Sequence, residues 1–241
     1  MEAQVTLGEH LLPYQWKQSP RRRTVAVTVH PENGVVVHTP SRYSRRRVEA
    51  FLREKAAWIL KHRARFEQER ARRRALRWEL GALLPFLGAR YPLHFVLDGG
   101  REQVRLEQGR FVLGLPLDGD GAALGGRVRE RMLDWYREQA TALILERVGH
   151  FKRLLCVTPL RVRVKQQKRR WGSCSAKGAL NFNWQLVLAP PDVLDYVVVH
   201  ELCHLIVLNH SPRFWALVEG VLPDYRERRR WLRENGHRLA L

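Results

Sequence analysis

Cysteine is scarce in this sequence. Its three cysteines, Cys156, Cys174 and Cys203, are odd in number, and none of them forms a CxxC pair. A disulfide framework needs paired cysteines and a cysteine-based zinc knuckle needs CxxC spacing, so the sequence argues against both. Free cysteines are typical of a reducing compartment, and we therefore expect a cytoplasmic protein.

Long apolar runs are also absent. No stretch approaches the roughly 18 apolar residues that a membrane-spanning helix requires. The amino-terminal segment contains Glu2 and Glu9, and it lacks the basic start and apolar run of a secretion signal. The sequence therefore predicts neither a membrane span nor a cleaved leader.

Acidic residues are few beside the basic ones. The chain has 24 Asp and Glu against 43 Lys and Arg, which gives a net charge of +19. Such a surface attracts nucleic acid and other polyanions. The candidate Arg-rich surface consists of two basic stretches, Arg70 to Arg77 and Lys165 to Arg170. Coding bias or a thermophilic source also gives an Arg-rich chain, and charge runs are usually solvated, so both interpretations stay open.

The first part of the chain predicts strands followed by a helix. The β-branched runs Thr24 to Val29 and Val35 to His38 surround an Asn-Gly pair, which is a strong hairpin signal. Ser41 or Ser44 then caps a helix that continues to about Gln68, with apolar residues near helical period. This pattern predicts an N-terminal β-hairpin and helix extension.

The middle of the chain predicts short strands and then a long helix. The expected strands are Leu80 to Leu84, Tyr91 to Leu97, Gln103 to Leu106 and Arg110 to Leu115. The loop-like segment 117–126 suggests a boundary between an N-terminal β-rich part, residues 1–120, and a catalytic part, residues 121–241. A helix is expected over Arg127 to Leu155.

The last third predicts the elements that surround the chemistry. Arg161 to Val164 and Leu180 to Ala189 are expected as strands, with a turn at Trp171-Gly172-Ser173 between them. Asp192 is a candidate N-cap for a strongly apolar helix over Val193 to Leu208.

That helix carries an H-E-x-x-H pattern. His200 and His204 are four residues apart, so one helical turn brings their Cβ atoms to about 5 to 6 Å and lets both rings bind one metal. Glu201 projects near the same opening, where it can accept a proton from the attacking water without occupying a coordination position. The pattern is typical of zinc peptidases and predicts Zn²⁺ as cofactor, with Glu201 as the catalytic base.

A catalytic zinc requires a third protein ligand and one open position. His210 lies six residues after His204, a spacing seen in metzincins, and we favour it because a nearby imidazole suits zinc. Glu219, on a second predicted helix, is the alternative ligand. The Met-turn that defines metzincins is excluded, because Met1 and Met132 are the only methionines and both lie upstream.

Several segments resemble the YgjP-like metallopeptidase family: RRWGSCSAKGALNFNWQLVLAP, DYVVVHELCHL and NHSPRFWALVE, with SPRRRTVAVTVHPENGVVVHTP and EKAAWILKH nearer the amino terminus. The resemblance implies an α+β fold with a zincin-like metallopeptidase core. It also implies a metal-dependent hydrolase whose motif positions are His200, Glu201, His204 and His210. The family is related in motif to the SprT and WLM groups, some of which resemble proteases that act on proteins crosslinked to DNA.

Three functions follow as hypotheses. The first is a zinc metallopeptidase that acts on peptide or protein substrates. The Trp171 to Cys174 turn and the strand Leu180 to Leu188 would border its cleft and give backbone partners to an extended peptide. The second is a basic nucleic-acid-binding protein whose zinc site is structural or weakly hydrolytic, and whose substrates would be nucleic-acid-associated proteins. The third is an amidohydrolase that uses the same metal chemistry on a smaller substrate.

Overall fold

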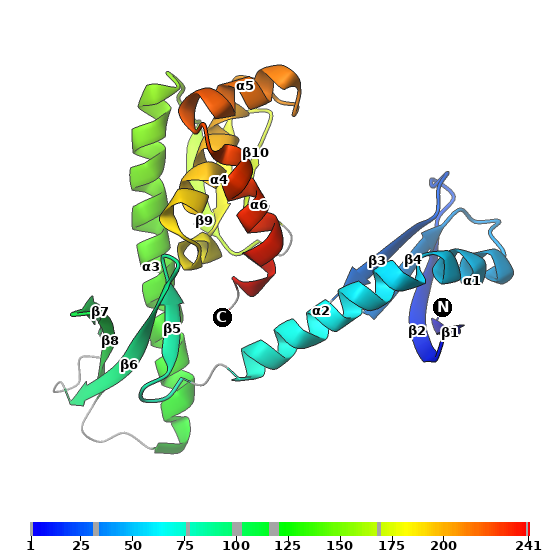
Figure 1. Cartoon of the computed structure of the whole chain (residues 1–241), viewed down its shortest axis with the longest axis horizontal. Helices are drawn as coiled ribbons and strands as arrows, with labels where there is room; N and C mark the ends of the chain where they lie inside the picture. Colours follow the sequence, from blue (N-terminus) through cyan, green and yellow to red (C-terminus); the bar gives the residue numbers. More distant parts are fainter. Residues whose placement is uncertain are drawn as a thin grey trace. The chain divides into compact units, whose positions relative to one another are not determined.

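The computed structural model describes residues 2–30, 34–75, 78–97, 103–115, 121–167, 170–239 and 241, which form two compact units (Figure 1). Unit 1 is Met1–Ala75 and unit 2 is Leu76–Leu241. In space, the division between the units falls earlier than the boundary expected at residues 120/121. The strands between residues 83 and 115 pack into the core of unit 2. Residues 116–120, beside the expected boundary, lie outside the described residues. None of the described helices is long and apolar enough to cross a membrane.

Unit 1 is a four-stranded sheet with two helices. In sheet order its strands are β1 (Glu2–Leu7), β2 (His10–Gln18), β4 (Gly34–Thr39) and β3 (Ala26–His30). Strands β3 and β4 pair antiparallel, which confirms the predicted hairpin, although Pro31 to Asn33 of its turn lie outside the described residues. Strand β2 runs parallel to β4, and β1 adds antiparallel to β2.

The predicted single helix is two helices, α1 (Arg45–Glu54) and α2 (Ala56–Ala75). Ser44 is the N-cap of α1, and its side chain accepts a hydrogen bond from the Arg47 backbone N–H. Lys55 ends α1 and interrupts the helical run. Val48, Leu52 and Ile59 are fully buried and pack with apolar residues of the sheet, so the two helices and the sheet share one small core.

Unit 2 contains two sheets arranged along one long helix. The first has the order β5 (Leu83–Phe86), β6 (Ala89–Leu97), β8 (Arg110–Leu115) and β7 (Val104–Glu107). The second has the order β10 (Gly172–Cys174), β11 (Ala179–Asn183) and β9 (Arg161–Lys165). The helices are α3 (Gly121–Leu154), η1 (Trp184–Leu188), α4 (Pro191–Cys203), α5 (Pro212–Val221), α6 (Tyr225–Asn235) and η2 (Gly236–Arg238). This mixed architecture confirms the predicted α+β fold class.

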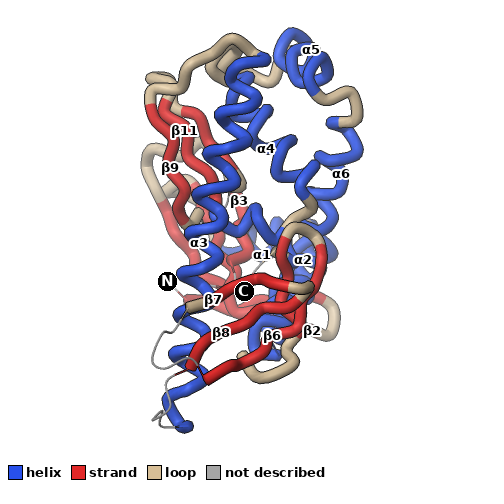
Figure 2. The backbone as a smooth tube through the Cα atoms, turned by 90° about the vertical axis from the view of Figure 1, so that its left-hand side faces the viewer, coloured by secondary structure: helices blue, strands red, loops and turns tan. Residues whose placement is uncertain are grey.

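Helix α3 holds these layers together. It runs beside β9 and contacts η1 and α4 (Figure 2). Its Tyr136 is fully buried and donates a hydrogen bond to the Pro85 carbonyl of β5 at 2.7 Å. Further along, Arg147 binds Asp195 of α4 through two hydrogen bonds of 2.6 and 2.8 Å. The helix that carries the H-E-x-x-H pattern is therefore fixed to the long helix by a bidentate ion pair.

Other local predictions in the last third of the chain were also wrong. The segment Trp171-Gly172-Ser173 does not form a turn, because Gly172–Cys174 is strand β10. The expected strand over Leu180 to Ala189 ends at Asn183, whose side chain accepts from the Gln185 backbone N–H and starts the 3-10 helix η1. Helix α4 begins at Pro191, ahead of the expected cap at Asp192.

Candidate metal centre

Three histidines converge at the carboxyl end of α4. Each of His200, His204 and His210 offers a ring nitrogen, and these atoms all lie within 4.8 Å of one another. The Nε2 atoms of His200 and His210 are 3.1 Å apart. Two nitrogens bound to a tetrahedral zinc at about 2.0 to 2.1 Å lie roughly 3.3 to 3.4 Å apart, so the histidines fit such an ion. In the described parts of the chain, no other three His, Cys, Asp or Glu side chains come together in this way.

The end of helix α4 orients the second histidine. The helix was expected to continue to Leu208, but it ends at Cys203, and His204 is its C-cap. The Val207 carbonyl lies 3.1 Å from His204 Nδ1. A carbonyl oxygen can only accept, so Nδ1 carries the proton and Nε2 keeps its lone pair for a metal. The early helix end therefore selects the tautomer that can bind.

The turn after α4 delivers the third histidine. Asn209 accepts a hydrogen bond from the Ser211 backbone N–H at 3.3 Å, just before α5 begins at Pro212. Because this turn is short, His210 returns to the end of the helix it follows. The spacing that favoured His210 in the sequence thus corresponds to an observed proximity in space.

Helix α5 supplies an aromatic wall for these rings. Phe214 stacks on His204 with ring centroids 4.5 Å apart, and Trp215 stacks on His210 at 5.6 Å. Phe214 also meets His200 edge-on at 4.9 Å and is fully buried. These contacts limit the rotation of all three imidazoles. Both aromatic residues lie about one turn beyond His210 in the sequence, a position that does not by itself indicate contact with the three rings.

The first histidine is held in its neutral form. Burial, together with the charges of His204, His210 and Arg229, lowers the pKa of His200 to about 3. The pKa of His210 is also lowered, again mainly by burial. A neutral imidazole is the form that donates a lone pair to a metal, so these two ligands need not lose a proton near neutral pH.

Glu201 is the one buried carboxylate of α4. Its side chain is only 6% exposed, and burial raises its pKa to about 7, partly offset by the charge of Arg170. Gly172 of β10 lies directly against it, since a Cβ added at that glycine would sit 2.6 Å from Glu201 Oε1. From the sequence, the Trp171 to Cys174 segment was considered as a border of the cleft, and Gly172 of that segment lies against Glu201.

Three other residues of this region lie outside the histidine group. The alternative ligand Glu219 forms an ion pair with Arg226 at 2.8 Å and does not join the histidine group. Cys203 is fully buried within the apolar core, as expected of a small packing residue. Tyr196 lies one turn before His200, with ring centroids 5.8 Å apart, and burial raises its pKa to about 12. It stays protonated near neutral pH.

Comparisons with known proteins give the family of the chain. The sequence matches the family described as YgjP-like, metallopeptidase domain, over residues 23–235. Among solved structures, the chain is similar to the metallopeptidase zymogen of Pyrococcus abyssi abylysin, with 26% sequence identity and a TM-score of 0.35. That match covers 38% of this chain and 93% of the other. No curated protein matches the chain.

Proposed function

The chain belongs to the YgjP-like metallopeptidase family, and we propose that it is a zinc-dependent peptidase with His200, His204 and His210 as the metal ligands. One observation carries this proposal. Three ring nitrogens meet within 4.8 Å beside a buried carboxylate, in the arrangement that a catalytic zinc requires. Zinc is the preferred metal because three imidazoles and an open position suit it, although availability also decides loading. When bound, zinc supplies Lewis acidity that polarises the scissile carbonyl and makes water more acidic.

Glu201 is the proposed general base. Its pKa of about 7 in the metal-free protein reflects burial, and a divalent cation nearby would lower this value and favour the carboxylate. The ionised carboxylate accepts a proton from the attacking water and then gives it to the leaving amine. Gly172 lets β10 approach the carboxyl group closely, which holds Glu201 in place for both transfers.

The proposed substrate is an extended peptide. Strand β10 lies at one edge of its sheet and pairs only with β11 among the described strands, so its other edge offers backbone donors and acceptors. A peptide added at this edge would pass beside Glu201, because Gly172 of the same strand contacts that side chain. The proposed edge for strand addition is therefore β10, which lies in the Trp171 to Cys174 segment considered from the sequence together with Leu180 to Leu188.

Metal analysis of matched variants tests the ligand set. We expect one zinc per chain in the wild type, loss of zinc in His210→Ala, and retention in Glu219→Ala, because Glu219 is paired with Arg226. Glu201→Gln should keep the zinc but lose peptide hydrolysis by at least about 100-fold, since it removes the proton acceptor. Zinc retained in His210→Ala, or full activity in Glu201→Gln, would contradict the assignment.

A further inference from the structure

Two loops lie side by side at one end of unit 1. The Ser19 backbone N–H donates to the Thr39 carbonyl at 2.9 Å, and Gln18 Nε2 donates to the carbonyls of Ser41 and Tyr43 at 3.2 and 3.4 Å. The loop after β2 and the loop after β4 are therefore joined, although about twenty residues separate them in sequence.

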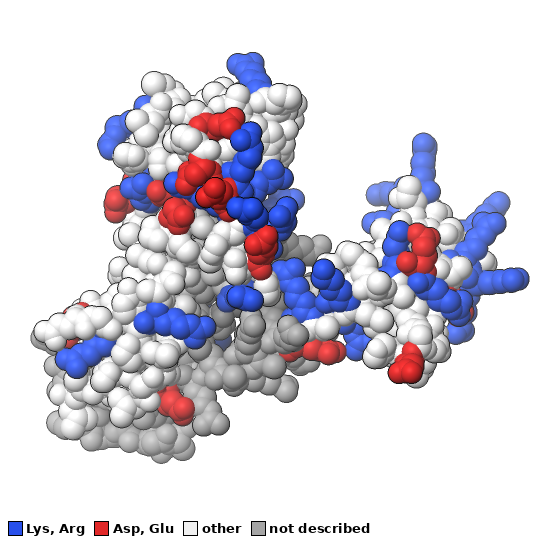
Figure 3. Space-filling model, viewed as in Figure 1, with Lys and Arg blue, Asp and Glu red and all other residues white. Residues whose placement is uncertain are grey.

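This junction gathers arginines from three runs of the chain. The first loop carries Arg21 to Arg23, the second carries Arg42, and α1 opens with Arg45 to Arg47. We call these seven residues the arginine cluster. Six of them are exposed and Arg22 is half-buried. Basic side chains project from this unit in the space-filling view (Figure 3).

The charge of the arginine cluster is almost uncompensated. Among the described residues, only Arg45 has a carboxylate partner, Glu49 at 2.8 Å. The first turn of α1 contains no acidic residue, so Arg45 to Arg47 place positive charge at the positive end of the helix dipole. Self-repulsion of this kind costs stability, and a bound anion would relieve it.

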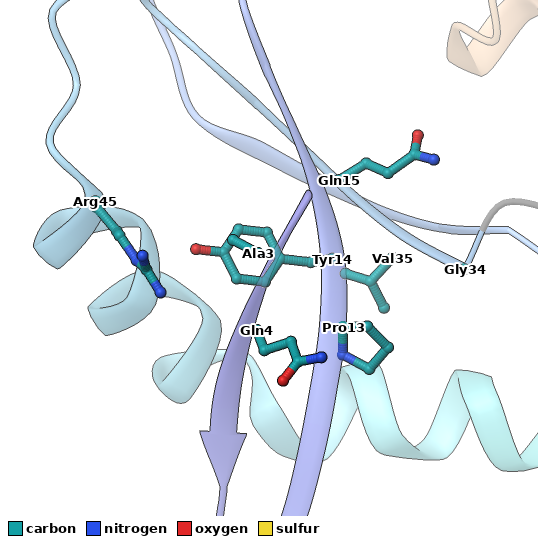
Figure 4. Close-up of a pocket in the computed structure, with 8 residues that line it drawn as sticks. All are labelled: Ala3, Gln4, Pro13, Tyr14, Gln15, Gly34, Val35 and Arg45. Carbon is teal, nitrogen blue, oxygen red and sulfur yellow. The ribbon is translucent and has the colours of Figure 1, made fainter. Parts of the chain in front are cut away.

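A buried polar group also lies beside the arginine cluster. Tyr14 is 2% exposed, and its hydroxyl lies next to the Arg45 guanidinium. It points toward Arg45 at a cavity of about 540 Å³ that both residues line (Figure 4). The Arg45 guanidinium can bind a phosphate oxygen at this cavity.

The charge is also unevenly distributed along the chain. Residues 1–75 contain 17 Lys and Arg against 7 Asp and Glu, whereas residues 76–241 contain 26 against 17. A coding bias toward arginine acts on the whole chain and does not account for an excess concentrated in the smaller unit. The basic stretches noted in the sequence add little here, because the side chains of residues 68–77 and residues 168 and 169 lie outside the described residues.

The surroundings favour nucleic acid over a membrane. Among the described residues of unit 1, the exposed large apolar side chains are Leu11 and Trp58. Leu11 lies at the start of β2 and Trp58 lies in α2, so neither belongs to the joined loops. Peripheral membrane binding needs apolar anchors within the basic surface. Tyr43, the aromatic residue of the second loop, is half-buried. The joined loops therefore offer no fully exposed ring on which a base could stack.

We propose that the arginine cluster binds the phosphate backbone of nucleic acid, without sequence preference, as an activity separate from peptide hydrolysis. Arginine suits this role because its planar guanidinium binds phosphate oxygens in pairs. Binding of this kind weakens steeply as salt displaces the released counterions.

Fluorescence anisotropy with a labelled DNA duplex and the full zinc-loaded chain tests this proposal. The triple variants Arg21/22/23→Gln and Arg45/46/47→Gln should each weaken binding at least about 10-fold and reduce the slope of log K against log salt by about 2 to 3. The control Arg161/Arg163/Lys165→Gln removes the same charge from the exposed side of β9 in unit 2 and should change binding less than about 2-fold.

Replacement by lysine separates charge from folding, because Arg45/46/47→Lys keeps the charge and should retain most of the binding. Three outcomes would overturn the proposal. They are no duplex binding at low salt, an equal loss in the β9 control, and binding to anionic lipid vesicles in place of DNA. Peptide hydrolysis, measured separately, should be the same in both arginine-cluster variants.

Discussion

At the residue scale, the sharpest constraint on the site is a glycine. Gly172→Ala would place a methyl group 2.6 Å from both Cγ and Oε1 of Glu201, so the carboxyl group must move. We expect peptide hydrolysis to fall at least about 10-fold, because small displacements of a catalytic group are costly. Zinc content should be unchanged, since Glu201 is not a proposed ligand.

Gly149→Ala is the matched control for that substitution. Gly149 lies within α3, and a Cβ added there meets nothing within 4 Å. Alanine should therefore leave activity intact and stabilise the helix by about 0.5 to 1 kcal/mol. Equal activities of the two variants would show that β10 does not position Glu201.

A second residue, His38, reports the potential of the arginine cluster. Burial lowers its pKa below the usual 6.5, and the charges of Arg22 and Lys17 lower it further. Arg22→Gln removes one of these charges, so the pKa should rise part of the way toward 6.5, with the burial contribution remaining. An NMR titration of the His38 ring measures this, and bound DNA should raise the pKa in the wild type. If the pKa of His38 stays constant in both experiments, the charge of the arginine cluster does not act on this ring.

At the scale of elements, one ion pair connects the long helix to the helix that carries the H-E-x-x-H pattern. Arg147 of α3 and Asp195 of α4 form two hydrogen bonds, and the Asp195 side chain is 16% exposed. Arg147→Ala leaves this carboxylate without its partner and should lower the free energy of unfolding by about 1 to 3 kcal/mol in a urea titration.

The same helix provides the comparison. Arg137 and Asp134 are also 2.6 Å apart, but about half of each side chain is exposed. Arg137→Ala should therefore cost no more than about 0.5 kcal/mol, because solvent screens an exposed pair. If both substitutions destabilise equally, the loss at Arg147 comes from helix propensity and packing and not from the connection to α4.

Elements also show what the sequence could predict. Local signals were sufficient for the β3–β4 hairpin, for a helix cap at Ser41 or Ser44, and for the three histidines, because helical period and ligand spacing are short-range. Long-range contacts were not predictable. The proximity of Gly172 to Glu201 depends on how β10 packs on α4, and the early end of α4 depends on a turn that the apolar run conceals.

At the scale of the whole molecule, the two units have separate apolar cores. The core of unit 1 includes Leu12 and Leu52, while that of unit 2 includes Phe182 and Phe214. All three candidate metal ligands belong to unit 2. A ligand that binds only the folded form stabilises the part that it binds, by about 2.7 kcal/mol at a hundredfold excess over the dissociation constant. Metal removal should therefore destabilise one unit selectively.

Calorimetry of the full chain with and without a chelator tests this expectation. We expect two unfolding transitions, of which the chelator lowers only one. Leu52→Ala, which removes a fully buried side chain from the core of unit 1, should cost about 2 to 5 kcal/mol and lower the other transition instead. A single transition that both treatments shift would mean that the units unfold together. If the chelator shifts neither transition, the metal does not stabilise the folded chain. That result would count against a tightly bound metal at the three histidines.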